Sequence, residues 1–158
     1  MNNRHQKYMQ RAIGVARQGM NDDKGGPFGA IVVKNDEIIA EACNRVSSSN
    51  DPTAHAEIEV IRKACYKLGT FQLADCIIYT SCEPCPMCFG AIYWARPKAV
   101  YYGCTKEDAA RIDFDDHFIY DELEKTQENQ EIPFEKMMQS EANEVFKEWK
   151  QKGNKILY

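Results

Sequence analysis

The chain of 158 residues lacks any long apolar run, and its amino-terminal stretch carries basic residues without a continuous hydrophobic segment. It also lacks an excess of positive charge, since 24 Asp and Glu residues outnumber 20 Lys and Arg residues and the net charge is −4. A protein that grips a phosphate backbone needs a broad basic surface. We therefore expect no membrane partner, no nucleic-acid partner, a small-molecule substrate and a cytoplasmic location.

A disulfide framework is also missing from the pattern of cysteines. The seven cysteines are an odd number, and Cys82, Cys85 and Cys88 lie within seven residues, which favours metal binding in a reducing compartment. The other four stand singly among apolar neighbours and are expected to be buried thiols: Cys43, Cys65, Cys76 and Cys104. No repeat or flexible linker interrupts the sequence, so residues 1–158 are predicted to form a single domain.

Hydrophobic periodicity predicts alternating helices and strands. Helices are expected at Asn3–Met20, from Asp51-Pro52 onwards, at Met87–Ala95, at Lys106–Ile112 and at Glu141–Gln151. Strands are expected at Phe28–Val33, Glu37–Ala42, Cys76–Thr80, Lys98–Tyr102 and Phe134–Gln139, the first two as a hairpin. Because a helix joins the third strand to the fourth, that pair should be parallel. The predicted fold is α/β: a three-layer α/β/α arrangement around a central mixed five-stranded sheet.

Two short motifs carry the chemistry of the sequence. Ala54-His55-Ala56-Glu57 supplies H-x-E, and Pro84-Cys85-Pro86-Met87-Cys88 supplies P-C-x-x-C. Together they form the signature of zinc-dependent nucleobase deaminases, in which one His and two Cys bind the metal and the Glu moves protons. His55, Cys85 and Cys88 are therefore the predicted ligands of one Zn²⁺, and Glu57 is the predicted proton carrier.

The local context agrees with this division of roles. In a helix, His55 and Glu57 would diverge by about 200°, so they would not bind one metal together. Cys85 precedes Pro86 and should lie near a helix N-cap, where the helix dipole stabilises a thiolate. Three protein ligands leave a fourth position for water, which zinc acidifies towards a pKa of about 7. Glu57 would then act as a general acid and base.

Cys82 leaves a second interpretation open, because Cys82-x-x-Cys85 overlaps the first C-x-x-C. A closed site with one His and three Cys would be a structural zinc module with no enzymatic activity. Against it, Cys82 is expected at the end of a strand, whereas Cys85 and Cys88 share the start of a helix.

The two motifs lie within longer stretches that are similar to known proteins, namely residues 50–57 (NDPTAHAE) and residues 80–100. The similarity also includes residues 26–30 (GPFGA), Phe114-Asp115-Asp116 and the terminal Tyr158. The chain resembles the cytidine deaminase superfamily, and within it the bacterial guanine deaminases. This resemblance covers nearly the whole chain. It implies zinc-dependent hydrolysis of guanine to xanthine and ammonia, and a homodimer that exchanges a carboxy-terminal segment, residues 114–158.

The resemblance also implies roles for residues outside the metal motif. Those that would contact the purine are Phe28 by stacking, Asn44 at the ring edge, the backbone of Ala56, Trp94 as a wall, Asp116 as a carboxylate that also serves catalysis, and Tyr158 as a cover. Ordinary structural roles remain open for several of them. Phe28 and Trp94 could be core packing, Asn44 a turn residue, and Asp115 could replace Asp116.

The main functional alternative is a tRNA adenosine deaminase or a deaminase of another small nucleobase, since these share the metal motif. A tRNA enzyme should carry a basic groove and a basic terminus that neutralise phosphates. The present chain ends in EWKQKGNKILY and is acidic overall. The sequence therefore favours guanine over tRNA.

Overall fold

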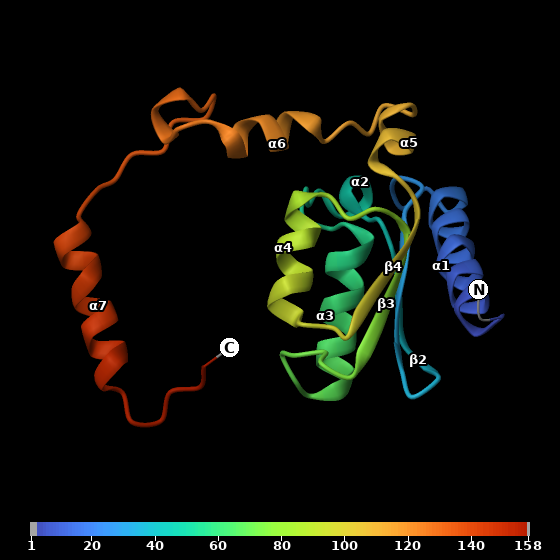
Figure 1. Ribbon diagram of the computed structural model, residues 1–158, viewed down its shortest axis with the longest axis horizontal. Helices are drawn as coiled ribbons and strands as arrows, with labels where there is room; N and C mark the ends of the chain where they lie inside the picture. Colours follow the sequence, from blue (N-terminus) through green and yellow to red (C-terminus); the bar gives the residue numbers. More distant parts are fainter. Residues whose placement is uncertain (1–2, 158) are drawn as a thin grey trace. The chain divides into compact units, whose positions relative to one another are not determined.

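The structure is a computed structural model that describes residues 3–157 (Figure 1). The chain divides into two units, the first ending at Asp116 and the second beginning at His117. All of the side chains recorded as buried within residues 3–157 belong to the first unit. None of the helices in this range is long and apolar enough to cross a lipid bilayer.

The first unit is built on a mixed sheet. Its strands are β1 (Gly29–Lys34), β2 (Glu37–Cys43), β3 (Cys76–Cys82) and β4 (Ala99–Cys104), in the order β2-β1-β3-β4. Strand β1 runs antiparallel to both β2 and β3, whereas β3 and β4 are parallel. Asn35 and Asp36 form the tight turn of the β1–β2 hairpin with positive φ angles, a conformation that Asn and Asp tolerate. The predicted hairpin and mixed sheet are confirmed.

Helices cover both faces of this sheet, which gives the first unit three layers (Figure 1). Helix α1 (Asn3–Asn21) packs on one face, and α3 (Ala56–Leu68) and α4 (Pro86–Ala95) pack on the other. The strands are apolar on both sides because each side is covered. Val32 and Ile78 join the cluster under α3 and α4, while Ile31 and Tyr79 join the cluster under α1.

The start of α3 differs from the sequence prediction. The helix was expected to begin at Asp51-Pro52, but it begins at Ala56, after the short helix α2 (Val46–Ser49) and a turn. The Asp51 carboxylate accepts hydrogen bonds from the backbone N–H (2.8 Å) and the hydroxyl (2.7 Å) of Thr53, which stabilises the turn instead of a helix. His55 therefore lies outside the helix, in an extended conformation with ψ 154°.

The predicted fifth strand is also wrong, and the sheet has four strands. The second unit contains α6 (His117–Glu124), the 3₁₀ turn η1 (Gln127–Asn129) and α7 (Gln139–Gln151), while residues 133–138 are irregular. Met138 has φ 52°, and it caps α7. A strand must pair its backbone with a neighbouring strand, and residues 117–157 contain none. The remaining short helix, α5 (Lys106–Ala110), follows β4 in the first unit.

Gly29 marks a close approach of α1 to the sheet. A Cβ there would lie 2.4 Å from the backbone nitrogen of Ala16 and 2.6 Å from the carbonyl oxygen of Ala12. Because backbone atoms cannot rotate away, we expect Gly29→Ala to lower the free energy of unfolding by roughly 1–3 kcal/mol, measured by urea denaturation. The control is Gly14→Ala in α1, where a Cβ meets no atom within 4 Å. Equal stability of the two variants would contradict this packing.

Candidate metal centre and active site

Two helices begin at the same edge of the sheet, and the residue that caps each one carries a metal-binding side chain. His55 is the N-cap of α3, and Cys85 is the N-cap of α4. Pro86 occupies the first turn of α4, where its fixed φ favours helix initiation and its missing N–H costs nothing. Cys88 follows one turn later on α4 and is buried. The predicted position of Cys85 at a helix start is confirmed.

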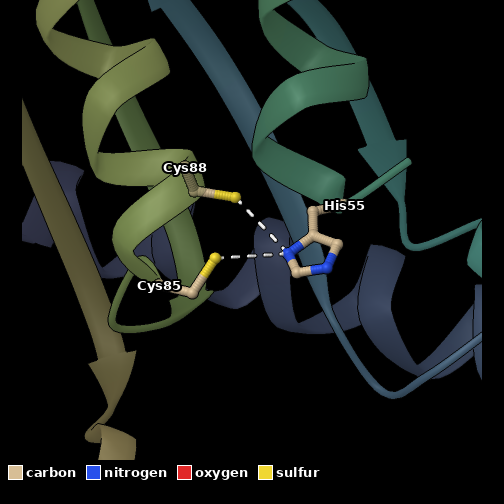
Figure 2. Close-up of side chains that lie close together, drawn as sticks. All are labelled: His55, Cys85 and Cys88. Carbon is tan, nitrogen blue, oxygen red and sulfur yellow. Dashed lines mark hydrogen bonds between the residues drawn. The ribbon is translucent and has the colours of Figure 1, made fainter. Parts of the chain in front are cut away.

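The three side chains point toward one another (Figure 2). The sulfur atoms of Cys85 and Cys88 each lie 3.5 Å from Nδ1 of His55, and all three donor atoms lie within 4.8 Å of one another. Tetrahedral zinc, with Zn–S bonds of about 2.3 Å and Zn–N bonds of about 2.0 Å, holds sulfur and nitrogen roughly 3.5 Å apart. The observed separation therefore fits zinc, and so does the set of two thiolates and one imidazole.

Close contact shifts the proton affinities of these groups. Hydrogen bonding from Cys88 and His55 lowers the pKa of Cys85, while the same pairing with Cys85, together with burial, raises the pKa of Cys88. The hydrogen bond to Cys85 also raises the pKa of His55. One thiolate is thus favoured here and a second is not. A divalent cation would stabilise both thiolates, assisted by the partial positive charge at the two helix N-termini.

Glu57 lies beside this cluster. It is the second residue of α3, it is only 5% exposed, and it accepts a hydrogen bond on Oε1 from the Thr80 hydroxyl at 2.7 Å. Its other oxygen, Oε2, accepts from the thiol of Cys88 at 3.5 Å. Burial raises the pKa of Glu57, and the bond from Thr80 opposes that rise. A buried carboxyl next to a candidate metal centre has the placement that proton transfer requires.

Cys82 faces a different partner. Its thiol donates to the backbone carbonyl of Thr105 at 3.5 Å, and burial raises the pKa of Cys82 to about 12. Among the described residues, the group able to hold a metal comprises His55, Cys85 and Cys88. The closed site with three cysteines is therefore not formed, and three protein ligands would leave a fourth coordination position of zinc for water.

Phe28 and Asn44 meet at the same edge of the sheet. The backbone N–H of Asn44 donates to the carbonyl of Phe28 at 2.9 Å, and the Phe28 ring contacts Phe114 edge to face at 4.9 Å between centroids. Oδ1 of Asn44, a residue only 6% exposed, accepts from the N–H groups of Gly26 and Val46, both at 3.2 Å. Within residues 3–157 its Nδ2 has no such partner. These bonds hold the amide oxygen of Asn44, so its Nδ2 group remains as a hydrogen-bond donor for a ligand.

Sequence reasoning missed two residues that support the site. A Cβ at Gly25 would lie 2.3 Å from Oδ1 of Asn44, so only glycine fits beside this amide. Residues 26–30 contributed to the family resemblance, and Gly25 was given no role at the site. The second is Thr80, whose hydroxyl holds Glu57. A polar residue within the apolar strand Cys76–Cys82 was the signal that could have revealed it.

Burial distinguishes Asp116 from Asp115 as a candidate for contact with the substrate. Asp116, the last residue of the first unit, is half-buried, whereas Asp115 is exposed. Burial, and then the negative charge of Cys85, raise the pKa of Asp116, and the Asp116 charge in turn helps to raise the pKa of His55. These observations favour Asp116 over Asp115 as the group that faces the cluster.

The remaining predicted substrate residues are Ala56, Trp94 and Tyr158. Ala56 is buried as the first residue of α3, where its backbone N–H has no partner within the helix. Trp94 is 63% exposed on α4 and lies about 9 Å beyond Cys88 along the helix axis, so the first unit alone does not bring it to the metal ligands. Tyr158 lies outside the described residues. The substrate contacts of all three stay predictions.

Comparison with known proteins agrees with this geometry. Residues 2–104 match the family described as the cytidine and deoxycytidylate deaminase zinc-binding region. The chain belongs to this deaminase family. It is 54% identical to the guanine deaminase of Bacillus subtilis (strain 168) over 154 residues, which is 98% of this chain and 99% of that protein. The X-ray structure of guanine deaminase from Bacillus subtilis superposes with a TM-score of 0.95, covering 100% of this chain and 99% of that one.

Other members of the deaminase family match over a shorter range. A structure of guanine deaminase from Nitrosomonas europaea gives a TM-score of 0.66 at 34% identity, covering 69% of this chain and 63% of that one. The tRNA-specific adenosine deaminase of Agrobacterium fabrum is 40% identical over 106 residues, which is 67% of this chain and 69% of that protein. The family zinc region and the His55, Cys85 and Cys88 cluster together support one zinc ion per chain.

The separate orientation of Cys82 can be tested by metal content. We expect Cys82→Ser to retain one zinc per chain, because the thiol bonds to Thr105 outside the cluster. Cys88→Ser should lower the zinc content sharply, because it removes one of three ligands. Atomic absorption on dialysed protein measures both. Loss of zinc from Cys82→Ser in a folded protein would mean that the structural zinc module is correct.

Proposed function

We propose that this protein catalyses the hydrolytic deamination of guanine to xanthine and ammonia. The observation that carries the proposal is the His55, Cys85 and Cys88 cluster with Glu57 buried beside it, within a chain that is 54% identical to a guanine deaminase over almost its full length. In the reaction, water replaces the exocyclic amine at C2 of the purine, and the amine leaves as ammonia.

His55, Cys85 and Cys88 would hold the zinc ion, which supplies an acidified water as nucleophile. Glu57 would accept one proton from this water and deliver it to a ring nitrogen. It would then take the second proton from the hydroxyl formed at C2 and pass it to the departing amine, which leaves as ammonia while C2 becomes a carbonyl. Its second oxygen, Oε2, lies on the side of Cys88. The burial of Glu57 keeps bulk water from exchanging this proton.

The purine would be held by groups at the same edge of the sheet. Asn44 presents amide donors, which suit the carbonyl oxygen and ring-nitrogen acceptors of guanine. Phe28 offers an aromatic ring for stacking, and the N–H of Ala56, which has no partner within its helix, would be a further donor. Asp116 would accept from the guanine edge and assist proton transfer, and Trp94 and Tyr158 would complete the enclosure.

A tRNA adenosine deaminase is the second candidate, because the chain is 40% identical to such an enzyme over 106 residues. That similarity extends over 67% of this chain, whereas similarity to a guanine deaminase extends over 98%. The net charge of −4 also disfavours a phosphate-binding surface. Guanine is therefore the proposed substrate, and no nucleic-acid partner is expected. An odd number of cysteines, two of them placed to hold a metal ion, suits the proposed cytoplasmic location.

Substitution of Glu57 tests the proposed mechanism. We expect Glu57→Gln to keep its zinc and to lose roughly 100- to 10,000-fold in kcat, because an amide cannot carry the proton. Ammonia and xanthine released from guanine are measured together with zinc content. Glu59→Gln, on the same helix, is the control, because it removes the same charge from a residue that pairs with Arg62 at 3.3 Å. Normal turnover by Glu57→Gln would refute this role.

We also propose that the protein is a homodimer in which residues 114–158 are exchanged between subunits. None of residues 117–157 is buried, although they include apolar side chains such as Phe118, Leu123, Phe146 and Trp149. The first unit in turn exposes Phe89, Tyr93 and Trp94 on α4. Large exposed apolar surfaces of this kind usually mark protein interfaces.

The association can be tested with chains of two lengths. We expect light scattering to give a dimer mass for the full chain and a monomer mass for a chain ending at Asp113, because the shorter chain lacks the whole exchanged segment, residues 114–158. Circular dichroism shows whether the shorter chain keeps its fold. A dimer of unchanged stability without residues 114–158 would contradict the exchange.

A further inference from the structure

One face of strand β3 carries a polar residue where its neighbours are apolar. Alternate residues of β3 face α3 and α4, and Cys76 and Ile78 belong to the apolar cluster there. Thr80 continues this row with an exposed fraction of 0%. Valine has nearly the same shape and no hydroxyl to desolvate, so packing alone gives no reason for threonine here.

The hydroxyl of Thr80 has a specific partner. It donates to Oε1 of Glu57 at 2.7 Å, while Oε2 of the same carboxylate lies 3.5 Å from the sulfur of Cys88. The two oxygens therefore face different surroundings, one the sheet and the other the metal ligands. Because the sheet backbone holds Thr80 in register with Ala30 and Tyr102, the hydroxyl is a fixed point.

We infer that Thr80 is a positioning residue: it anchors Oε1 of Glu57 so that Oε2 is the oxygen that carries the proton between water and the purine. This inference rests on the proposed deaminase function. A carboxylate held by one oxygen cannot turn its plane freely, and its second oxygen stays aimed at the reacting atoms. Misplacement of a catalytic group by about 1 Å can cost 100-fold in rate.

Two substitutions at Thr80 separate the hydroxyl from the shape of the side chain. We expect Thr80→Val to keep its zinc and its KM for guanine, because it touches neither, while kcat falls about 10- to 100-fold. Thr80→Ser should recover most of kcat, because it restores the donor. The control is Val32→Thr on the neighbouring strand β1, which buries a new hydroxyl in the same cluster. It should lower the melting temperature and leave kcat unchanged. An unchanged kcat in zinc-loaded Thr80→Val would overturn the inference.

A double-mutant cycle distinguishes positioning from general destabilisation. Glu57→Asp shortens the side chain and draws the carboxylate away from Thr80. If Thr80 acts through Glu57, Thr80→Val should change kcat less than about 2-fold in this background, whereas a structural effect would multiply through both backgrounds.

Crystal structures of the zinc-loaded wild type and of Thr80→Val report the carboxylate position without any need for turnover. A rotated Glu57 carboxylate in Thr80→Val supports the inference, and an unmoved one contradicts it. If the wild-type protein releases no ammonia from guanine, the proposed function fails, and the crystal structures still decide the role of Thr80.

Discussion

The site depends on negative charge gathered where two helices begin. The thiol groups of Cys85 and Cys88 lie against the His55 imidazole, and the Glu57 carboxyl is buried beside them. In a buried setting such groups either stay protonated, as the raised pKa values of Cys88 and Glu57 favour, or need positive charge beside them to ionise. The N-termini of α3 and α4 supply part of that charge, and a metal ion supplies the rest. The opposed pKa shifts of the two cysteines express the same requirement.

The sheet explains why these helix starts coincide. Helix α4 carries the chain from β3 to the parallel strand β4, and it begins at Pro86, shortly after β3 ends at Cys82. Antiparallel pairing of β1 with β3 brings the start of β1 to the same edge, where Ser81 accepts a hydrogen bond from the N–H of Gly29 at 3.0 Å. The starts of α3, α4 and β1 and the end of β3 thereby meet at one edge of the sheet, as is usual at the carboxyl ends of strands in α/β sheets.

The polar groups of the site are oriented by contacts on their far sides. Asn44 uses its amide oxygen for the backbone of Gly26 and Val46, which leaves its donors directed elsewhere. Glu57 uses one oxygen for Thr80 and presents the other. A buried hydrogen-bonding group costs free energy when it is unpaired, so these contacts both stabilise the fold and restrict the groups that act on substrate.

The sequence alone determined the metal motif, the hairpin, the cap at Cys85 and the alternation of helices and strands, because these follow from residue spacing and local propensity. It failed at Asp51, where the side chain stabilises a turn that periodicity does not reveal. It failed again at residues 134–139, because a strand exists only when another strand is available to pair with it. Tertiary structure alone decided that Cys82 bonds to Thr105, how the Asn44 amide is oriented, and that Thr80 holds Glu57. The contacts of Cys82 with Thr105, Asn44 with Gly26 and Thr80 with Glu57 join residues 18 or 23 positions apart, and only folding brings such residues within hydrogen-bond distance.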